Sequence, residues 1–511
     1  MSISETEIQQ GLAAGDRRGG AARLGERLLV ISNADFAIAT IVAAGAILRL
    51  ALAGGPMLND EILALEHVRP LNHFWDVFWG ISHDNNHFLT SLWLYWLDSR
   101  EVGPLALRAP SILMGAALIP VMATISRRSG QAAGLVAAAL TSFSYFFFNY
   151  SVEARGYAGL ALAFACAFDA TERCIGDPRS PARYALAAAT GLGALSHFAM
   201  VPATAFLALG AGAALLRRSE RVAAAIDAWL RIFIPAGLAT LPTFAFFYLG
   251  ILNKGAITIG AIMPFDPFYF FRALAIAIVD SFGLPIELSI TATIPIAIVL
   301  IATSLVATIA LASRAVSAER KFLYVAIIFG MPIAVFLLRP FNAHVPRYYL
   351  VVPLTLILLI SDFLGAWWRA GGRRRAAAAA ALTAALAGGG AQIYQFQVNQ
   401  AHPWSEALAA IAASSDPVVT TDFDDRIGLF VRYYNWREDA HIEWVAANDV
   451  CGKQPEWLLI WWASLDEPMP ERRMIGNSCP MSFKFIGRHS TWGLSKVPWA
   501  LYRRERPDGS G

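Results

Sequence analysis

Charged residues are scarce in this chain, and that scarcity argues against an ordinary soluble protein. Only 15% of the 511 residues are Asp, Glu, Lys or Arg, whereas about 25% is usual in soluble domains. Apolar residues make up 56%, and the mean hydropathy is +0.49. The net charge is only +3, and no arginine-rich helix with interleaved aromatic residues is present, so no nucleic-acid partner is expected. The composition indicates a polytopic membrane protein.

Cysteine is also rare, with four residues in the whole chain. Cys166 and Cys174 fall in or at the end of an apolar run and are interpreted as packing residues. Cys451 and Cys479 are alone together near the C-terminus, and in an oxidising compartment such a pair predicts a disulfide. A small-residue cleavage site is missing after the first apolar run, so that run is expected to be retained as a membrane span.

Long apolar runs predict an all-α polytopic membrane protein with about eleven transmembrane helices, because each run can cross about 30 Å of hydrocarbon. A shorter run at 87–97 predicts a helix that lies along the membrane interface. The predicted spans are 35–54, 105–125, 131–149, 156–174, 184–197, 199–216, 228–250, 286–312, 322–338, 348–368 and 375–391.

Arginine and lysine concentrate in one alternate set of loops, and this asymmetry predicts the orientation. It places segment 1–34 in the cytoplasm and the external loop 55–104 outside the membrane domain 35–391. An odd number of spans also puts the tail 392–511 outside, which in a bacterium means the periplasmic face of the inner membrane. The tail mixes strand-like runs such as EWLLIWW and WALYRR with a helical stretch at 425–434. It predicts a small C-terminal α/β soluble domain.

The external loop carries the first candidates for chemistry. Asp60 and Glu61 follow the first span directly, so their carboxylates are expected at the membrane surface, within reach of a lipid phosphate. The same loop holds four of the nine histidines. His83 and His87, with Asp84 between them, could bind a divalent cation if the segment were helical, but the two asparagines after Asp84 favour a turn and a hydrogen-bonding role.

Cationic side chains occur in three other external segments. Arg155 leaves the third span in the sequence EARGY, Arg347 stands in RYYL at the outer start of the tenth, and Lys254 lies in the loop 251–285. An arginine can donate two parallel hydrogen bonds to a phosphate group, although at a helix end it can also serve as an interfacial anchor. These three are the predicted phosphate-binding residues, and the predicted substrate-binding residues are Glu153, Asp84, Asn86, His87, His344 and Tyr348.

Several short motifs in fixed order carry a family resemblance. They are the Asp-Glu pair at 60–61, NNHF at 85–88, LRAPS at 107–111, EARGY at 153–157 and RYYL at 347–350. Together they resemble the GT-C glycosyltransferases that use polyprenyl-phosphate sugars, in the branch of the protein O-mannosyltransferases and lipid A aminoarabinose transferases. The resemblance implies that Asp60 is the catalytic base with Glu61 as its neighbour, and that Arg155 and Arg347 face the lipid phosphate.

This sequence departs from the His-Pro-Pro motif of that family, having Asn86-His87-Phe88 instead. No metal ligand set is therefore carried over, and a divalent cation stays open. Displacement of a phosphate needs a base and cations but no general acid, and a single displacement inverts the sugar carbon. The expected acceptor is lipopolysaccharide or lipid A, another glycan or a protein hydroxyl.

Two other functional classes remain open. A transporter or flippase would be expected to show inverted repeats and polar, interrupted helices at mid-membrane, but ionisable residues gather outside the predicted spans instead. A membrane protein without catalysis would leave the external carboxylates and arginines unexplained.

Overall fold

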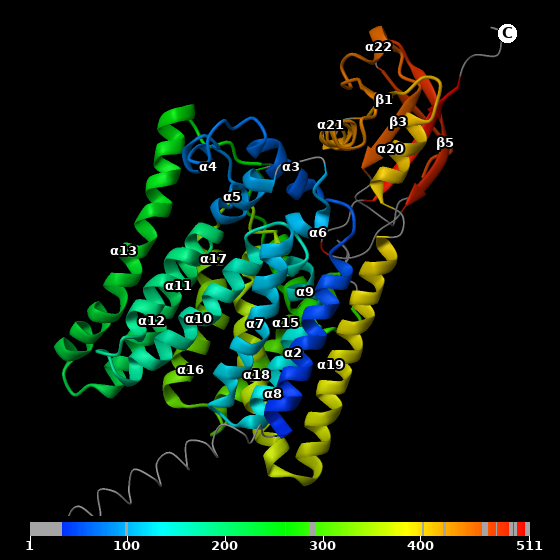
Figure 1. Ribbon diagram of the computed structural model, residues 1–511. Helices are drawn as coiled ribbons and strands as arrows, with labels where there is room; N and C mark the ends of the chain where they lie inside the picture. The colour runs from blue at the N-terminus through cyan, green and yellow to red at the C-terminus, as the bar shows by residue number, and fades with distance from the viewer. Residues whose placement is uncertain are drawn as a thin grey trace, which may run out of the picture.

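The computed structural model describes residues 33–97, 101–260, 262–286, 288, 292–400, 403–422, 426–461, 469–476, 478–489, 494 and 498–505. A bundle of long helices carries a small sheet domain at one end (Figure 1). The predicted architecture, an all-α polytopic membrane protein with a small C-terminal α/β domain, is confirmed. The predicted cytoplasmic segment 1–34 lies almost wholly outside the described residues.

Within the described ranges, eight helical stretches are long and apolar enough to cross a membrane, and a bent pair of helices would make a ninth. The pair is α8 (Gln131–Phe143) and α9 (Tyr145–Ser151), which meet at 58°. The eight are α2 (Asn33–Leu52), α7 (Ala109–Arg127), α12 (Met200–Arg218), α13 (Val222–Lys254), α15 (Thr293–Ala312), α16 (Ala318–Val325) continued through a π turn (Ala326–Gly330) into α17 (Met331–Leu338), α18 (Val351–Ala370) and the stretch that begins with α19 (Gly372–Asn399).

Two of the eleven predicted spans are helices that do not meet these conditions, the first because of its charged residues and the second because of its length. Helix α10 (Tyr157–Gly176) carries Asp169, Glu172 and Arg173 near its end, and α11 (Ala182–Ser196) has only 15 residues. The predicted external loop 251–285 also differs, because it contains α14 (Pro267–Phe282). The Asp266 side chain accepts a hydrogen bond from the Tyr269 amide at 3.1 Å, which caps the start of that helix.

A buried arginine stabilises the break between α8 and α9. Arg49 of α2 donates hydrogen bonds to the carbonyls of Thr141 and Ser142, at 3.2 and 3.3 Å, in the last turn of α8. These carbonyls have no partner within the helix, and a cation is favourable at a helix C-terminus. The new direction of the chain after Ser144 carries α9 to the segment that contains Arg155.

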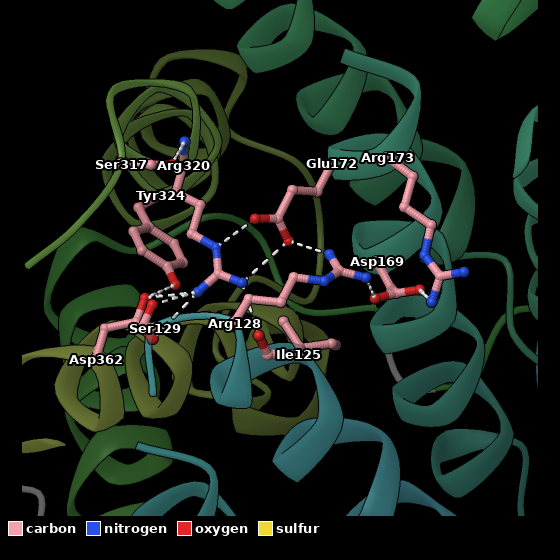
Figure 2. A network of polar contacts seen from close by, with 10 residues as sticks. All are labelled: Ile125, Arg128, Ser129, Asp169, Glu172, Arg173, Ser317, Arg320, Tyr324 and Asp362. Carbon is pink, nitrogen blue, oxygen red and sulfur yellow. Dashed lines mark hydrogen bonds and ion pairs between the residues drawn. The ribbon is translucent and has the colours of Figure 1, made fainter. Parts of the chain in front are cut away.

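A network of ion pairs around the buried Arg320 joins four helices at the end of the bundle opposite the C-terminal domain (Figure 1 and Figure 2). Arg320 of α16 contacts Glu172 of α10 at 2.5 Å and Asp362 of α18 at 2.9 Å. Tyr324 donates a further bond to Asp362 at 2.8 Å, and Arg128 pairs with Glu172. Since Arg155 immediately precedes α10 and Arg347 precedes α18, the network fixes the two helices that lead from these arginines.

The segment 55–104 contains four short helices at the end of the bundle that carries the C-terminal domain (Figure 1). The predicted helix at 87–97 is present as α5, although its Trp93 and Tyr95 donate to the carbonyls of Ala106 and Asn72 rather than facing only a membrane surface. The four are α3 (Asn59–Val68), α4 (Asp76–Trp79), α5 (Phe88–Leu97) and α6 (Pro104–Leu107).

The C-terminal domain is a six-stranded mixed sheet with strand order β2-β1-β3-β6-β5-β4. Strands β2, β1 and β3 run parallel to one another, and the pairings β3–β6, β6–β5 and β5–β4 are antiparallel. Cys451 and Cys479 are joined by a disulfide with a Cα–Cα distance of 5.6 Å. The elements are α20 (Trp404–Ala412), β1 (Val418–Thr420), α21 (Arg426–Glu438), β2 (Glu443–Trp444), α22 (Val450–Lys453), β3 (Trp457–Trp461), β4 (Arg472–Ile475), β5 (Met481–His489) and β6 (Trp499–Arg504).

Candidate active site

The carboxylate of Asp60, in the first turn of α3, is the centre of the site. Its Oδ2 accepts a hydrogen bond from Nη1 of Arg155 and lies 3.2 Å from Nη2 of Arg347. Asn59 donates to Oδ1 at 3.1 Å. Burial by itself raises the pKa of Asp60, but the charges of Arg155 and Arg347 more than offset that effect and lower it to about 2. The side chain remains 28% exposed, so a reactant can reach it.

Arg155 lies between α9 and α10 and is almost completely buried. Its Nη2 donates to Oδ1 of Asn85 at 2.7 Å and lies 3.5 Å from Nε2 of His87. Burial lowers the pKa of the guanidinium, but the charge of Asp60 raises it above its ordinary value. The side chain is therefore a fixed, fully charged donor.

Arg347 reaches the same carboxylate from a 3-10 helix (Pro346–Tyr349). Its Nε, like that of Arg155, is buried and has no hydrogen-bond partner within the described part of the chain. Two guanidinium groups thus converge on one carboxylate and leave an excess of one positive charge. An anion with several oxygens, such as a phosphate, matches both the charge and the two unused Nε donors.

Two neutral histidines flank the arginines. The rings of His87 and His197 stack with centroids 4.9 Å apart, and both side chains approach Tyr157. Burial, reinforced by His197 and the two arginines, holds the pKa of His87 well below its ordinary value. Burial and the same arginines lower the pKa of His197 to about 3. A third positive charge is thereby avoided beside the two guanidinium groups.

The remaining predicted residues of this region lie beside Arg347. Burial and then the charge of Arg347 lower the pKa of His344, whose buried Nδ1 has no partner in the described residues. The ring of Tyr348 lies 6.2 Å from His197 and 6.0 Å from the guanidinium carbon of Arg347. The structure therefore gathers Asp60, Arg155, Arg347 and these neighbours from distant parts of the sequence.

Glu61 points away from Asp60 and is fully buried. Its oxygens accept from Nε and Nη2 of Arg108 at 2.8 and 2.6 Å, from the Ala154 amide at 2.5 Å and from the Leu58 amide at 2.8 Å. Four donors leave no lone pair for an acceptor hydroxyl. These contacts suit the expected role of Glu61 as a neighbour of Asp60 that orients α3, and a direct catalytic part for it stays a prediction. Its partner is the motif residue Arg108, to which sequence reasoning gave no role.

The neighbouring asparagines Asn85 and Asn86 make different contacts, although only Asn86 was predicted to bind substrate. Asn86 is buried and donates to the carbonyls of Val77 and Ile81, at 2.9 and 3.4 Å, so its amide nitrogen holds the loop, and its contact with substrate stays a prediction. Asn85 is the asparagine at the site, because its Nδ2 donates to the Asp60 carbonyl at 3.0 Å while its Oδ1 accepts from Arg155. Two adjacent asparagines in a polar turn indicate that the turn makes hydrogen bonds at the site. The sequence does not indicate which of the two residues makes them.

Asp84 joins the two segments 55–104 and 251–285, which are predicted to be external loops. It pairs with His83 at 2.9 Å and accepts from the Gly260 amide at 3.2 Å, and the hydrogen bond from His83 helps to lower its pKa against the effect of burial. His83 faces His67, with ring centroids 4.6 Å apart, and not His87. Among the described residues no group of three or more His, Cys, Asp or Glu side chains could hold a metal ion.

The two other predicted residues, Lys254 and Glu153, make no side-chain bond to Asp60 among the described residues. Lys254 is exposed at the end of α13, and none of its described contacts reaches Asp60. Its predicted contact with the phosphate stays a prediction. Glu153 is buried and accepts a hydrogen bond from Asn149 at 2.7 Å, so its position favours a structural role over contact with substrate.

No protein-family model and no curated protein matches the sequence. The structure is similar to ArnT from Cupriavidus metallidurans in the apo state, with 12% identity and a TM-score of 0.43, over 92% of this chain and 98% of that one. The structure is also similar to ArnT from Cupriavidus metallidurans bound to undecaprenyl phosphate, with 13% identity and a TM-score of 0.40, over 92% of this chain and 98% of that one. The Archaeoglobus fulgidus oligosaccharyltransferase complex with Zn and sulfate is similar with 12% identity and a TM-score of 0.45, over 82% of this chain and 68% of that one. Likenesses of this size do not establish a shared function.

Proposed function

We propose that this protein is a membrane glycosyltransferase that moves a sugar from a polyprenyl-phosphate donor to a hydroxyl group of a cell-envelope acceptor. The observation that carries the proposal is the carboxylate of Asp60 held between Arg155 and Arg347 at one end of an apolar helix bundle. The apolar helices suit a lipid-linked donor, the arginines suit its phosphate, and the carboxylate suits the removal of a proton.

The arginines act on the donor. When the phosphate enters, the guanidinium groups donate to its oxygens and hold the negative charge that develops there as the bond to the sugar breaks. Phosphate is already a good leaving group, so no acid has to protonate it. His87 and His197 stay neutral and keep the surroundings of the arginines free of further charge.

Asp60 acts on the acceptor. With both arginines bound to it, the carboxylate has a pKa of about 2 and is a weak base. A donor phosphate that draws the guanidinium groups away removes the cause of that low pKa, so the carboxylate becomes more basic when the donor is in place. It then accepts the proton of the attacking hydroxyl. A single displacement of this kind inverts the configuration at the sugar carbon.

The acceptor belongs to the same proposal. It is lipopolysaccharide or lipid A, another envelope glycan or a protein hydroxyl, and the site and the C-terminal domain face the periplasm of a bacterial inner membrane. The distribution of arginine and lysine in the loops supports this orientation.

The test is an assay of purified protein in detergent with a panel of radiolabelled polyprenyl-phosphate sugars and bacterial envelope fractions as acceptors. Transfer of label that depends on Asp60 is expected. EDTA in parallel reactions tests the need for a divalent cation. Uptake or flipping of the labelled lipid by proteoliposomes, with no transfer to any envelope fraction, would support the transporter and contradict the proposal.

Arg347→Ala is expected to weaken binding of undecaprenyl phosphate and to slow transfer, because one of two phosphate donors is lost. A hydrogen bond to a charged group is worth about 1.5–3 kcal/mol, so the affinity should fall by about 10–100-fold. Arg339→Ala removes the same charge from an exposed position of the same loop and is the control. Equal affinities for the parent and Arg347→Ala would favour the alternative role of Arg347 as an anchor of the helix end.

The same variant has a pH signature. Arg347 is one cause of the low pKa of Asp60, so its removal should raise that pKa toward the ordinary carboxyl value. Asp60 then becomes protonated earlier as the pH falls, and the acid limb of kcat/KM should move to higher pH. An unchanged acid limb would mean that Asp60 is not the group that titrates.

A further inference from the structure

Helix α3 has two opposite faces, and only one belongs to the site. Asp60 and His67 lie seven residues apart on the face toward the site. Ile62, Leu65 and Glu66, spaced by three and four residues, lie on the other. Ile62 and Leu65 are completely or almost completely buried. The second face therefore has a partner along its whole length.

That partner is the C-terminal domain. Ile62 and Leu65 share one hydrophobic core with Leu408 of α20 and with Ile427 and Phe430 of α21. Figure 1 shows α21 beside α3, at the end of the bundle. A helix of ten residues is marginal in water by itself, so α3 depends on such packing for its order.

Polar contacts fix the position of α3 under this domain. The indole Nε1 of Trp404 donates to the carbonyl of Met57, just before the helix, at 2.9 Å. At the other end of α3, the guanidinium carbon of Arg69 lies 4.2 Å from the ring of Trp436, and Glu66 lies 3.7 Å from Arg432. Both ends of the helix that carries Asp60 are thus in contact with the C-terminal domain.

We propose that the C-terminal domain is a positioning element for Asp60, with Trp404 and Trp436 as positioning residues that act through α3. The inference rests on the proposed function, because it concerns the placement of the proposed base. The domain does not touch Arg155 or Arg347 in any contact among the described residues, so it should govern the reaction of bound donor rather than donor affinity.

The chain offers a matched control for the test. Trp404→Phe removes an indole N–H that bonds to the Met57 carbonyl, whereas Trp457→Phe removes one that bonds to Ser414 inside the same domain, at 3.0 Å. Both tryptophans are buried. A small misplacement of a reacting group can cost about 10²-fold, so Trp404→Phe should lower kcat by about tenfold or more. Affinity for undecaprenyl phosphate should stay within twofold, and Trp457→Phe should leave both quantities close to the parent.

A second pair of variants tests the other end of α3. Trp436→Leu removes the aromatic ring beneath Arg69, so its kcat should be lower than that of the parent. Trp436→Phe keeps an aromatic ring there, so its kcat should be close to that of the parent. Equal kcat for Trp404→Phe and Trp457→Phe, or equal losses in both Trp436 variants, would overturn the positioning role. Neither result would affect the proposed function, which fails instead if Asp60→Asn transfers sugar normally.

Discussion

Asp60→Asn is expected to lower sugar transfer by about 10²–10⁴-fold, the usual contribution of a general base. Asparagine has nearly the same shape, so folding and insertion should be unchanged, but its amide cannot take a proton from a hydroxyl. Rates are measured with the labelled polyprenyl-phosphate donor that the parent accepts. Undecaprenyl phosphate should bind as tightly as before or a few times more tightly, since Arg155 and Arg347 lose the carboxylate that competes for them.

Asp84→Asn makes the same chemical change in the same external loop and is the control. Asp84 bonds to His83 and to the Gly260 amide and makes no direct bond to Arg155 or Arg347 among the described residues, so its variant should retain most of the activity. Glu61→Gln should also harm turnover less than Asp60→Asn. A larger loss of turnover in Glu61→Gln than in Asp60→Asn would indicate that Glu61 is the base. Normal turnover in Asp60→Asn would show that the Asp60 carboxylate takes no part in the reaction.

The centre of the site could be predicted because its three charged residues stand at ends of apolar runs. A chain that crosses a membrane alternates sides, so Asp60, Arg155 and Arg347 were expected on one side before any contact was known. The charge asymmetry of the loops predicts that this side is the external one. Hydropathy is a strong signal, and the corresponding helices are present.

Directions of individual side chains could not be predicted in the same way. Asn85 and Asn86 are identical and adjacent, but only the first bonds to Arg155, because successive residues of a turn point to different sides. Arg108 looks like Arg155 in the sequence, since both adjoin apolar runs. Only the packed structure shows that every N–H of Arg108 is bonded to protein.

Helix α14 was missed although its sequence contains a signal for it. The prolines of MPFDPFYFF favoured an irregular loop, but Asp266 followed by Pro267 is the usual order of a capping residue and a first helical position. The helix matters to the site, because Phe270 packs against Tyr349, two residues from Arg347.

The other large effect is expected on stability, from Arg108→Met. The guanidinium of Arg108 is buried and donates to both oxygens of Glu61 and to the carbonyls of Ala53, Gly55 and Pro56, at 2.8–2.9 Å. Methionine fills similar space but leaves Glu61 charged and unpaired in the protein interior. Removal of one partner of a buried ion pair costs about 3–5 kcal/mol, so the variant should unfold at a clearly lower temperature in detergent and lose transfer.

Two further variants separate this structural role from a loss of positive charge. Arg347→Met makes the same change at a partly exposed arginine, so it should weaken donor binding but hardly alter the unfolding temperature. The double variant Glu61→Gln/Arg108→Met removes the unpaired charge while the new amide oxygen still accepts from a backbone N–H, so it should be more stable than Arg108→Met alone. An Arg108→Met protein that unfolds with the parent would show that the pair with Glu61 does not hold α3 in place, and the orientation of Asp60 would then have to come from the C-terminal domain.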